Sequence, residues 1–199
     1  MSIANYFTFV RILISPIFLL IYLEHDAFNI SDVMLPYFLL ALLGISELSD
    51  AFDGYLARKY DQVTDLGKVL DPMADSISRI SVFLTFTLDP VKLPMILVFI
   101  FLYRDSVIST LRTICALKGF ALAARTSGKI KAIIQAIAAF IVLILMIPHS
   151  LGHLSTSSLH LAGTIIISAA ALYTIYSGIE YIYANRKYIS RLLRTKNNR

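Results

Sequence analysis

The protein has 199 residues, of which 57% are hydrophobic and only 16% are charged. Its mean hydropathy is +0.73, and a soluble domain of this length cannot bury so much apolar surface, so lipid is the expected solvent. The single cysteine, Cys115, excludes an internal disulfide framework and a cysteine-based zinc site. The formal net charge of +5 is interpreted first as a signal of membrane topology, and no nucleic-acid partner is expected.

Six apolar segments approach the roughly 20 residues that a membrane-spanning helix requires. In chain order, these segments cover residues 7–23, 33–46, 72–88, 93–117, 130–147 and 161–184. No apolar alternation with a period of two is sustained, so strands are not expected. The sequence therefore predicts an all-α, polytopic membrane protein with six transmembrane helices.

The first apolar segment lacks a preceding charged region and a small-residue cleavage site. It is therefore interpreted as a retained helix rather than as a signal peptide. One transmembrane domain is expected over residues 1–199, with a basic cytosolic tail from about residue 186 that is attracted to anionic membrane lipid.

The connections between these segments alternate in basic charge. Those at 24–32, 89–92 and 148–160 contain a single lysine or arginine, Lys92. The other connections and the tail contain Lys59, Lys68, Lys118, Arg125, Lys129, Arg186, Lys187, Arg191, Arg194, Lys196 and Arg199. By the positive-inside rule, we expect a multi-pass protein of the cell (inner) membrane with both termini facing the cytoplasm.

Acidic residues concentrate at the same cytoplasmic side, where seven of the thirteen lie between Glu47 and Asp75. On helices, Asp50 and Asp53 share one face, and so do Asp71 and Asp75. The connection between the two helices is short, so they are expected to be antiparallel neighbours whose four aspartates can meet. Any one aspartate could instead be a helix cap or a solvated end. Four carboxylates together, without histidine or cysteine, favour a hard cation such as Mg²⁺ or Mn²⁺.

Small residues and an arginine separate these aspartates. Gly54 and Ala57 leave a bare stripe on which a flat ligand can approach the helix, and Arg58 can bind phosphate through its planar fork. Gly67 repeats the small-residue feature on the facing helix. Taken alone, the two glycines would be equally consistent with close packing between membrane helices.

The complete spaced set is Asp50, Asp53, Gly54, Ala57, Arg58, Gly67, Asp71 and Asp75. It resembles the signature of the CDP-alcohol phosphotransferase family at all eight positions. The resemblance implies six transmembrane helices, a homodimer, and transfer of a phosphatidyl or related group from a CDP-linked donor to an acceptor hydroxyl with release of CMP.

By this resemblance, metal binding is assigned to Asp50, Asp53, Asp71 and Asp75, which would share two Mg²⁺ or Mn²⁺ ions. Asp75 would also act as the general base. The walls of the CDP pocket are assigned to Gly54, Ala57, Arg58 and Gly67. These roles are physically coherent, because two metal ions can bind a pyrophosphate and a carboxylate can deprotonate the attacking hydroxyl.

Three residues near the start of the chain, Asn5, Thr8 and Arg11, have helical spacing and lie on the cytoplasmic side. They resemble a further family feature next to the CDP-linked donor. The alternative is that they anchor the first helix at the membrane interface.

Two arginines of the fourth apolar segment, Arg104 and Arg112, are eight residues apart and near one helix face. Together with Lys129 they are predicted to bind a phosphate on the acceptor. The alternative for the arginines is structural pairing with Asp105.

The sequence around these residues, from about 5 to 135, resembles the bacterial family members that make phosphatidylglycerophosphate. Ser76, Thr113 and Ala132 depart from residues frequent in that group. The resemblance implies CDP-diacylglycerol as donor and sn-glycerol 3-phosphate as acceptor. Synthesis of phosphatidylinositol phosphate, phosphatidylserine or cardiolipin is the nearest alternative, and a cation transporter using intramembrane acids is a different class.

Overall fold

The computed structural model describes residues 3–59, 65–118, 122 and 125–193, with side chains described except at 3–7, 51, 53–59, 65–72 and 191–193. Within these residues, the regular secondary structure is entirely helical. In order, the elements are α1 (Ile3–Glu24), the short 3-10 helix η1 (His25–Phe28), α2 (Leu35–Lys59), α3 (Asp65–Thr85), α4 (Met95–Leu117), α5 (Thr126–Ser150), α6 (Thr156–Ala184) and α7 (Arg186–Leu193). The predicted all-α class is confirmed.

Local chemistry explains where several helices start and stop. Asn29 adopts a left-handed conformation, with φ 55°, directly after η1, and Gly152 does so with φ 77° between α5 and α6. Pro94 precedes the first residue of α4. Ser155 caps α6, because its side-chain oxygen accepts a hydrogen bond from the Ser158 backbone N–H at 3.2 Å.

The helices α2 and α3 extend well beyond the apolar segments that predicted them. The connection expected at residues 59–70 is shorter than predicted, because α2 continues to Lys59 and α3 already begins at Asp65. Hydropathy marks only the part of a helix suited to hydrocarbon, whereas the backbone hydrogen bonds continue into polar sequence. All four aspartates of the motif consequently lie on helices.

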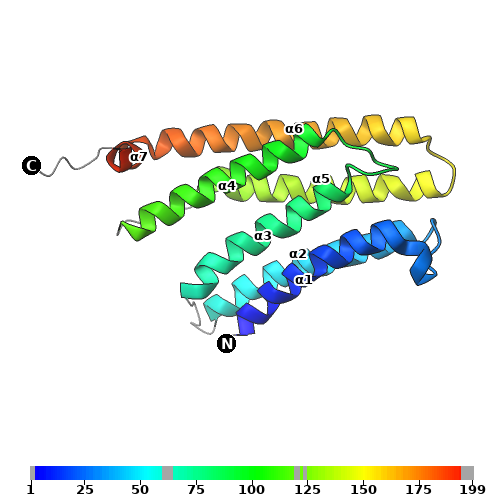
Figure 1. Cartoon of the computed structure of the whole chain (residues 1–199), viewed down its shortest axis with the longest axis horizontal. Coiled ribbons are helices and arrows are strands. Elements are labelled where there is room, and N and C mark those ends of the chain that lie inside the picture. The colour runs from blue at the N-terminus through cyan, green and yellow to red at the C-terminus, as the bar shows by residue number, and fades with distance from the viewer. Residues whose placement is uncertain (1–2, 60–64, 119–121, 123–124, 194–199) are drawn as a thin grey trace, which may run out of the picture.

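The long helices form an elongated bundle. Helix α1 packs against α2 and α3, α2 also packs against α5, and α6 packs against α4 and α5. Buried phenylalanines connect these layers: the ring centroids of Phe83 and Phe101 are 4.6 Å apart, and those of Phe18 and Phe86 are 6.5 Å apart. The start of α1, the end of α2, the start of α3 and the end of α4 lie toward one end of the bundle, whereas η1 and the α5–α6 connection lie at the other (Figure 1).

Many large apolar side chains lie on the outside of the bundle rather than in its core, including Leu13, Met95, Leu117 and Leu172. Such a surface suits lipid rather than water. Within the described residues, three helical stretches are long and apolar enough to cross a membrane: Thr8–Phe28, Thr126–Ser150 and Thr156–Ala184. The fold is therefore a helical bundle with three candidate membrane spans, while the predicted total of six crossings stays a prediction.

Candidate active site

Three helices bring charged side chains together near the end of the bundle where α1 starts. Arg11 on α1 is 2% exposed, and its Nη1 donates a 2.6 Å hydrogen bond to Oδ1 of Asp50 on α2. The same nitrogen contacts Oδ1 of Asp75 on α3. A buried guanidinium thus links two carboxylates from different helices and offsets part of their mutual repulsion.

A small cavity adjoins this charged contact. It is lined by Arg11, Ser46, Glu47, Asp50, Asp75, Ser78 and Arg79. The buried hydroxyls of Ser46 and Ser78 are 3.1 Å apart and connect α2 to α3 directly beside the acids. Thr8 is also buried, one turn before Arg11 on α1. The carboxylates are therefore positioned by packed helices rather than by loops.

Several predicted site residues lie outside the described side chains. The α2 backbone carries Asp53, Gly54, Ala57 and Arg58 in its last turns, and the α3 backbone carries Gly67 and Asp71 in its first turns. Asn5 is in the first turn of α1, and its side chain is likewise outside the description. The placement of these residues on α1, α2 and α3 agrees with the helical spacing of the motif.

The donor atoms around Asp50 and Asp75 fit a hard divalent cation. Both residues offer carboxylate oxygens, and one positively charged nitrogen, Nη1 of Arg11, contacts an oxygen of each. Among the described side chains, no group of three or more histidine, cysteine, aspartate or glutamate residues is close enough to hold a metal. Two of the four motif aspartates, Asp53 and Asp71, are outside that set.

A second cavity, of about 290 Å³, shares Asp75 and Arg79 of α3 with the small cavity. The residues that line it are Asp75, Ser76, Arg79, Arg104, Asp105, Ile108, Ser109, Arg112, Arg125, Gly128, Lys129, Lys131, Ala132 and Tyr181. Six of these described lining residues are basic and two are acidic. We call this space the basic cavity. Its charge suits an anionic ligand.

At one side of the basic cavity, Arg104 is held by neighbouring side chains. Its Nη1 donates to Oδ1 of Asp105 at 2.9 Å, and its Nη2 donates to Ser177 Oγ at 2.8 Å. Lys131 Nζ donates to the same Asp105 oxygen at 2.6 Å. A Cβ added at Gly178 would lie 3.1 Å from Arg104 Cγ, so this glycine makes room for the arginine stem. Structural pairing with Asp105, the alternative to acceptor binding, is thus present at Arg104.

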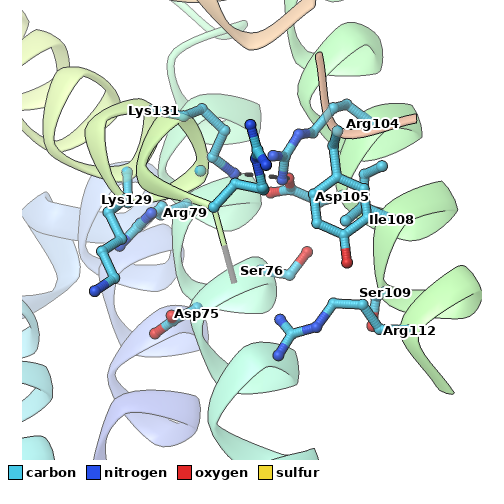
Figure 2. Close-up of a pocket in the computed structure, with 14 residues that line it drawn as sticks. Asp75, Ser76, Arg79, Arg104, Asp105, Ile108, Ser109, Arg112, Lys129 and Lys131 are labelled. Atoms are coloured by element: carbon cyan, nitrogen blue, oxygen red, sulfur yellow. Dashed lines mark hydrogen bonds and ion pairs between the residues drawn. The ribbon is translucent and has the colours of Figure 1, made fainter. Parts of the chain in front are cut away.

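Arg112 and Lys129, the other two predicted acceptor-binding residues, also line this cavity. Both are exposed, and neither makes an ion pair within the described part of the chain. Figure 2 shows Asp75, Ser76 and Arg112 in the lower part of the cavity and Arg104, Asp105 and Lys131 in the upper part. The structure therefore brings together Asp75 and all three predicted basic residues around one space.

Arg79 is a cavity residue that the sequence interpretation missed. It lies four residues after Asp75 on α3, and its side chain projects into the basic cavity (Figure 2). An arginine within an apolar segment is itself a signal of function. The sequence interpretation treats the segment 72–88 as a membrane span that carries the last motif aspartate, and it assigns Arg79 no role.

A polar contact between α5 and α6 borders the basic cavity. Arg125, directly before α5, contacts Glu180 of α6, and Ser127 Oγ donates to Glu180 Oε2 at 2.6 Å. These contacts tie the first turn of α5 to α6. Lys129 and Lys131 follow on that same turn and the next, so the contacts with Glu180 help to position both lysines.

A family model described as CDP-alcohol phosphatidyltransferase matches residues 1–176, which include both cavities except Tyr181. The chain belongs to this family. The resemblance drawn from the eight motif residues is thereby confirmed.

Similar proteins with curated names agree with the family assignment. A protein of Rickettsia bellii named CDP-diacylglycerol–glycerol-3-phosphate 3-phosphatidyltransferase is 32% identical over 189 residues, covering 94% of this chain and 97% of the relative. A Bacillus subtilis protein of the same name is 32% identical over 193 residues, covering 92% and 95%. A Mycobacterium tuberculosis protein named probable phosphatidylglycerophosphate synthase is 28% identical over 183 residues, covering 91% and 80%.

Proposed function

We propose that this protein transfers the phosphatidyl group of CDP-diacylglycerol to sn-glycerol 3-phosphate, producing phosphatidylglycerophosphate and CMP. The observation that carries the proposal is the position of Asp75, which lines both the small acidic cavity and the basic cavity. A base at this position can reach an acceptor in the basic cavity while it lies next to Asp50, which is proposed to hold the metal ions that bind the donor. The names of the relatives from Rickettsia bellii and Bacillus subtilis support the same donor and acceptor.

The chemistry proposed is a single in-line displacement. Asp75 removes the proton from the acceptor hydroxyl, and the hydroxyl oxygen of the acceptor forms a bond to the lipid-proximal phosphorus of the donor. The bond from that phosphorus to the pyrophosphate bridging oxygen breaks, and CMP leaves with the bridging oxygen and its electron pair. No covalent enzyme intermediate is needed.

The four aspartates of the motif are proposed to hold two divalent cations, Mg²⁺ or Mn²⁺. When bound, these ions would neutralise charge on the pyrophosphate and on the departing CMP. The contact of Asp50 and Asp75 with one Arg11 nitrogen supports the convergence of α2 and α3 that such a site needs. Asp53 and Asp71 would complete the ligand set.

The donor is proposed to bind along α1, α2 and the start of α3. Asn5, Thr8 and Arg11 would contact it from α1, and the contact of the buried Arg11 with Asp50 and Asp75 supports this. The CDP moiety would lie along Gly54, Ala57, Arg58 and Gly67.

The acceptor phosphate is proposed to bind in the basic cavity. Arg112 and Lys129 would contact it directly, because neither is engaged in an ion pair within the described structure. Arg104 contributes positive charge to the same space while its guanidinium is held by Asp105 and Ser177. A neutral acceptor would not compensate the excess of basic over acidic residues that line the basic cavity.

The proposed setting is the cell (inner) membrane, with six crossings and with both termini and the active site facing the cytoplasm. The lengths of α1 to α6, from 21 to 29 residues, support six crossings, since each helix would extend about 30 Å or more. A homodimer is proposed from the family resemblance.

Release of CMP from CDP-diacylglycerol by the purified protein tests this function. We expect release that requires glycerol 3-phosphate, is abolished by EDTA, and is restored by Mg²⁺ or Mn²⁺. Glycerol, serine, inositol and inositol phosphate, supplied singly, test the alternative acceptors. A preference for any of them over glycerol 3-phosphate would contradict the proposed acceptor. Uptake of cations by vesicles that contain the protein, without release of CMP, would favour a transporter.

A further inference from the structure

Arg79 lies at the junction of three spaces inside the bundle. It lines the basic cavity, the small cavity that contains Asp50 and Asp75, and a third, narrow cavity next to Glu47 and Gln135. Its side chain is half-buried, whereas Arg112 and Lys129 are exposed. Arg79 is therefore a basic residue that lines both the acidic and the basic parts of the site.

Among the described side chains, none forms a close ion pair with Arg79. The guanidinium makes no hydrogen bond or ion pair within the described residues, although Glu47, Asp75 and Lys131 are near enough to interact with it electrostatically. In contrast, Arg104 and Lys131 both donate to Asp105, and Arg125 contacts Glu180. A half-buried arginine whose guanidinium makes no hydrogen bond to a described side chain can still bind an anionic ligand.

The direction of the side chain indicates which anion. Figure 2 shows Arg79 extending into the basic cavity toward Asp105 and Lys131, on the far side from Asp75. Because Asp75 and Arg79 are four residues apart, they present a carboxylate and a guanidinium on one face of α3. An acceptor with a hydroxyl at one end and a phosphate at the other could meet the carboxylate with the first and the guanidinium with the second.

We propose that Arg79 binds the phosphate of the acceptor and thereby places the opposite hydroxyl against Asp75, which makes Arg79 a determinant of acceptor specificity. This inference rests on the proposed transfer to a phosphorylated acceptor. Arg79 and Asp75 would contact the two ends of the acceptor from one rigid helix. An acceptor that lacks the phosphate would bind without its hydroxyl aligned to Asp75. Arg112 and Lys129 would contact the same phosphate from the exposed side.

The test compares Arg79→Ala and Arg79→Lys with wild type, using purified full-length protein in lipid nanodiscs. We expect Arg79→Ala to raise the KM for glycerol 3-phosphate by about 10- to 100-fold, because a charge-assisted contact is lost. Any rate with glycerol as acceptor is expected to fall by a smaller factor, because glycerol has no phosphate for Arg79 to bind, and the Kd for CDP-diacylglycerol is expected to stay within about threefold of wild type. Arg79→Lys should recover part of the loss, since it keeps the charge without the planar fork.

Lys118→Ala is the matched control, because Lys118 is an exposed cation at the end of α4 that lines none of the three cavities. It should match wild type throughout. Equal losses with glycerol 3-phosphate and glycerol would overturn the proposal, as would a loss of donor affinity comparable to the loss of acceptor affinity. A lowered Tm in both Arg79 variants with unchanged acceptor preference would assign Arg79 a structural role instead. If wild type itself showed no preference for glycerol 3-phosphate, the proposed function would fail before any variant was compared.

Discussion

The two cavities that share Asp75 and Arg79 differ in the charge of the residues that line them. In the small cavity, acids from α2 and α3 meet a single buried arginine from α1. In the basic cavity, six described basic residues face two acids. Each region carries charge that is costly in or near a membrane, about 2.5–3.5 kcal/mol per residue at a helix centre. The difference indicates complementary ligands: cations for the acids and an anion for the basic residues.

Asp75 and Arg79 belong to both regions, so the reaction is proposed to occur where the two meet. The comparison also separates two kinds of basic residue. Arg104 is fixed by Asp105, Ser177 and the close approach of Gly178, whereas Arg112 and Lys129 are exposed at the cavity. Substitutions on the two sides should therefore have different kinetic signatures.

The largest effects are expected on the acidic side. Asp75→Asn should lower kcat by about 10²- to 10⁴-fold, because the proton acceptor for the attacking hydroxyl is lost. Asp50→Asn, Asp53→Asn and Asp71→Asn should also remove nearly all turnover, since each is proposed to hold the metal ions. Release of CMP measures turnover, and binding of a CDP-diacylglycerol analogue should survive better in Asp75→Asn than in the other three. Near-normal CMP release by any of these variants would refute the role of that aspartate.

A smaller effect, confined to the acceptor, is expected in the basic cavity. Arg112→Ala should raise the KM for glycerol 3-phosphate by about 10- to 100-fold, with little change in donor affinity. Lys129→Ala should raise the same KM by a smaller factor, because a lysine ammonium, unlike an arginine, makes no bidentate contact with a phosphate. Initial rates over a range of acceptor concentrations measure both. Weaker donor binding in Arg112→Ala would show that the two regions are not divided between donor and acceptor.

A still smaller effect should follow from crowding the fixed arginine. In Gly178→Ala, the new Cβ would lie 3.1 Å from Arg104 Cγ, so the arginine stem must shift by a few tenths of an ångström. We expect kcat/KM for glycerol 3-phosphate to fall by about two- to tenfold, since the bonds to Asp105 and Ser177 are disturbed. Gly44→Ala is the control, because its Cβ would meet no atom within 4 Å. Equal behaviour of the two variants would mean that the position of Arg104 is unimportant for the acceptor.

The last prediction concerns the side of the membrane on which both regions open, and it should leave activity unchanged. Ser157→Cys and Ser190→Cys, each in a Cys115→Ser background, place a thiol at an exposed position near either end of α6 and α7. The first should react with an impermeant reagent from outside intact cells, and the second only after permeabilisation. Labelling of both from one side would remove the sixth crossing and the proposed cytoplasmic tail.

Sequence reasoning went furthest where local spacing carried the information. The helical spacing of Asp50 and Asp53, and of Asp71 and Asp75, predicted two carboxylate-bearing helices, and both helices are present. It was less accurate at helix ends, because hydropathy underestimated the lengths of α2 and α3, which continue into polar sequence. Arg79 was missed because a single arginine after the motif has no local pattern that distinguishes a ligand-binding residue from a residue at the membrane boundary.

The sequence by itself determined the helical class, the apolar exterior, the family and the set of acidic residues, because each depends on composition or on spacing along one or two helices. Only the tertiary structure decided which side chains share a space. Arg11 meets Asp50 and Asp75 across 39 and 64 residues of sequence, and Arg104 reaches Ser177 across 73. Such contacts depend on how helices pack in three dimensions, and small residues such as Gly178 permit that packing without leaving a charge pattern in the sequence.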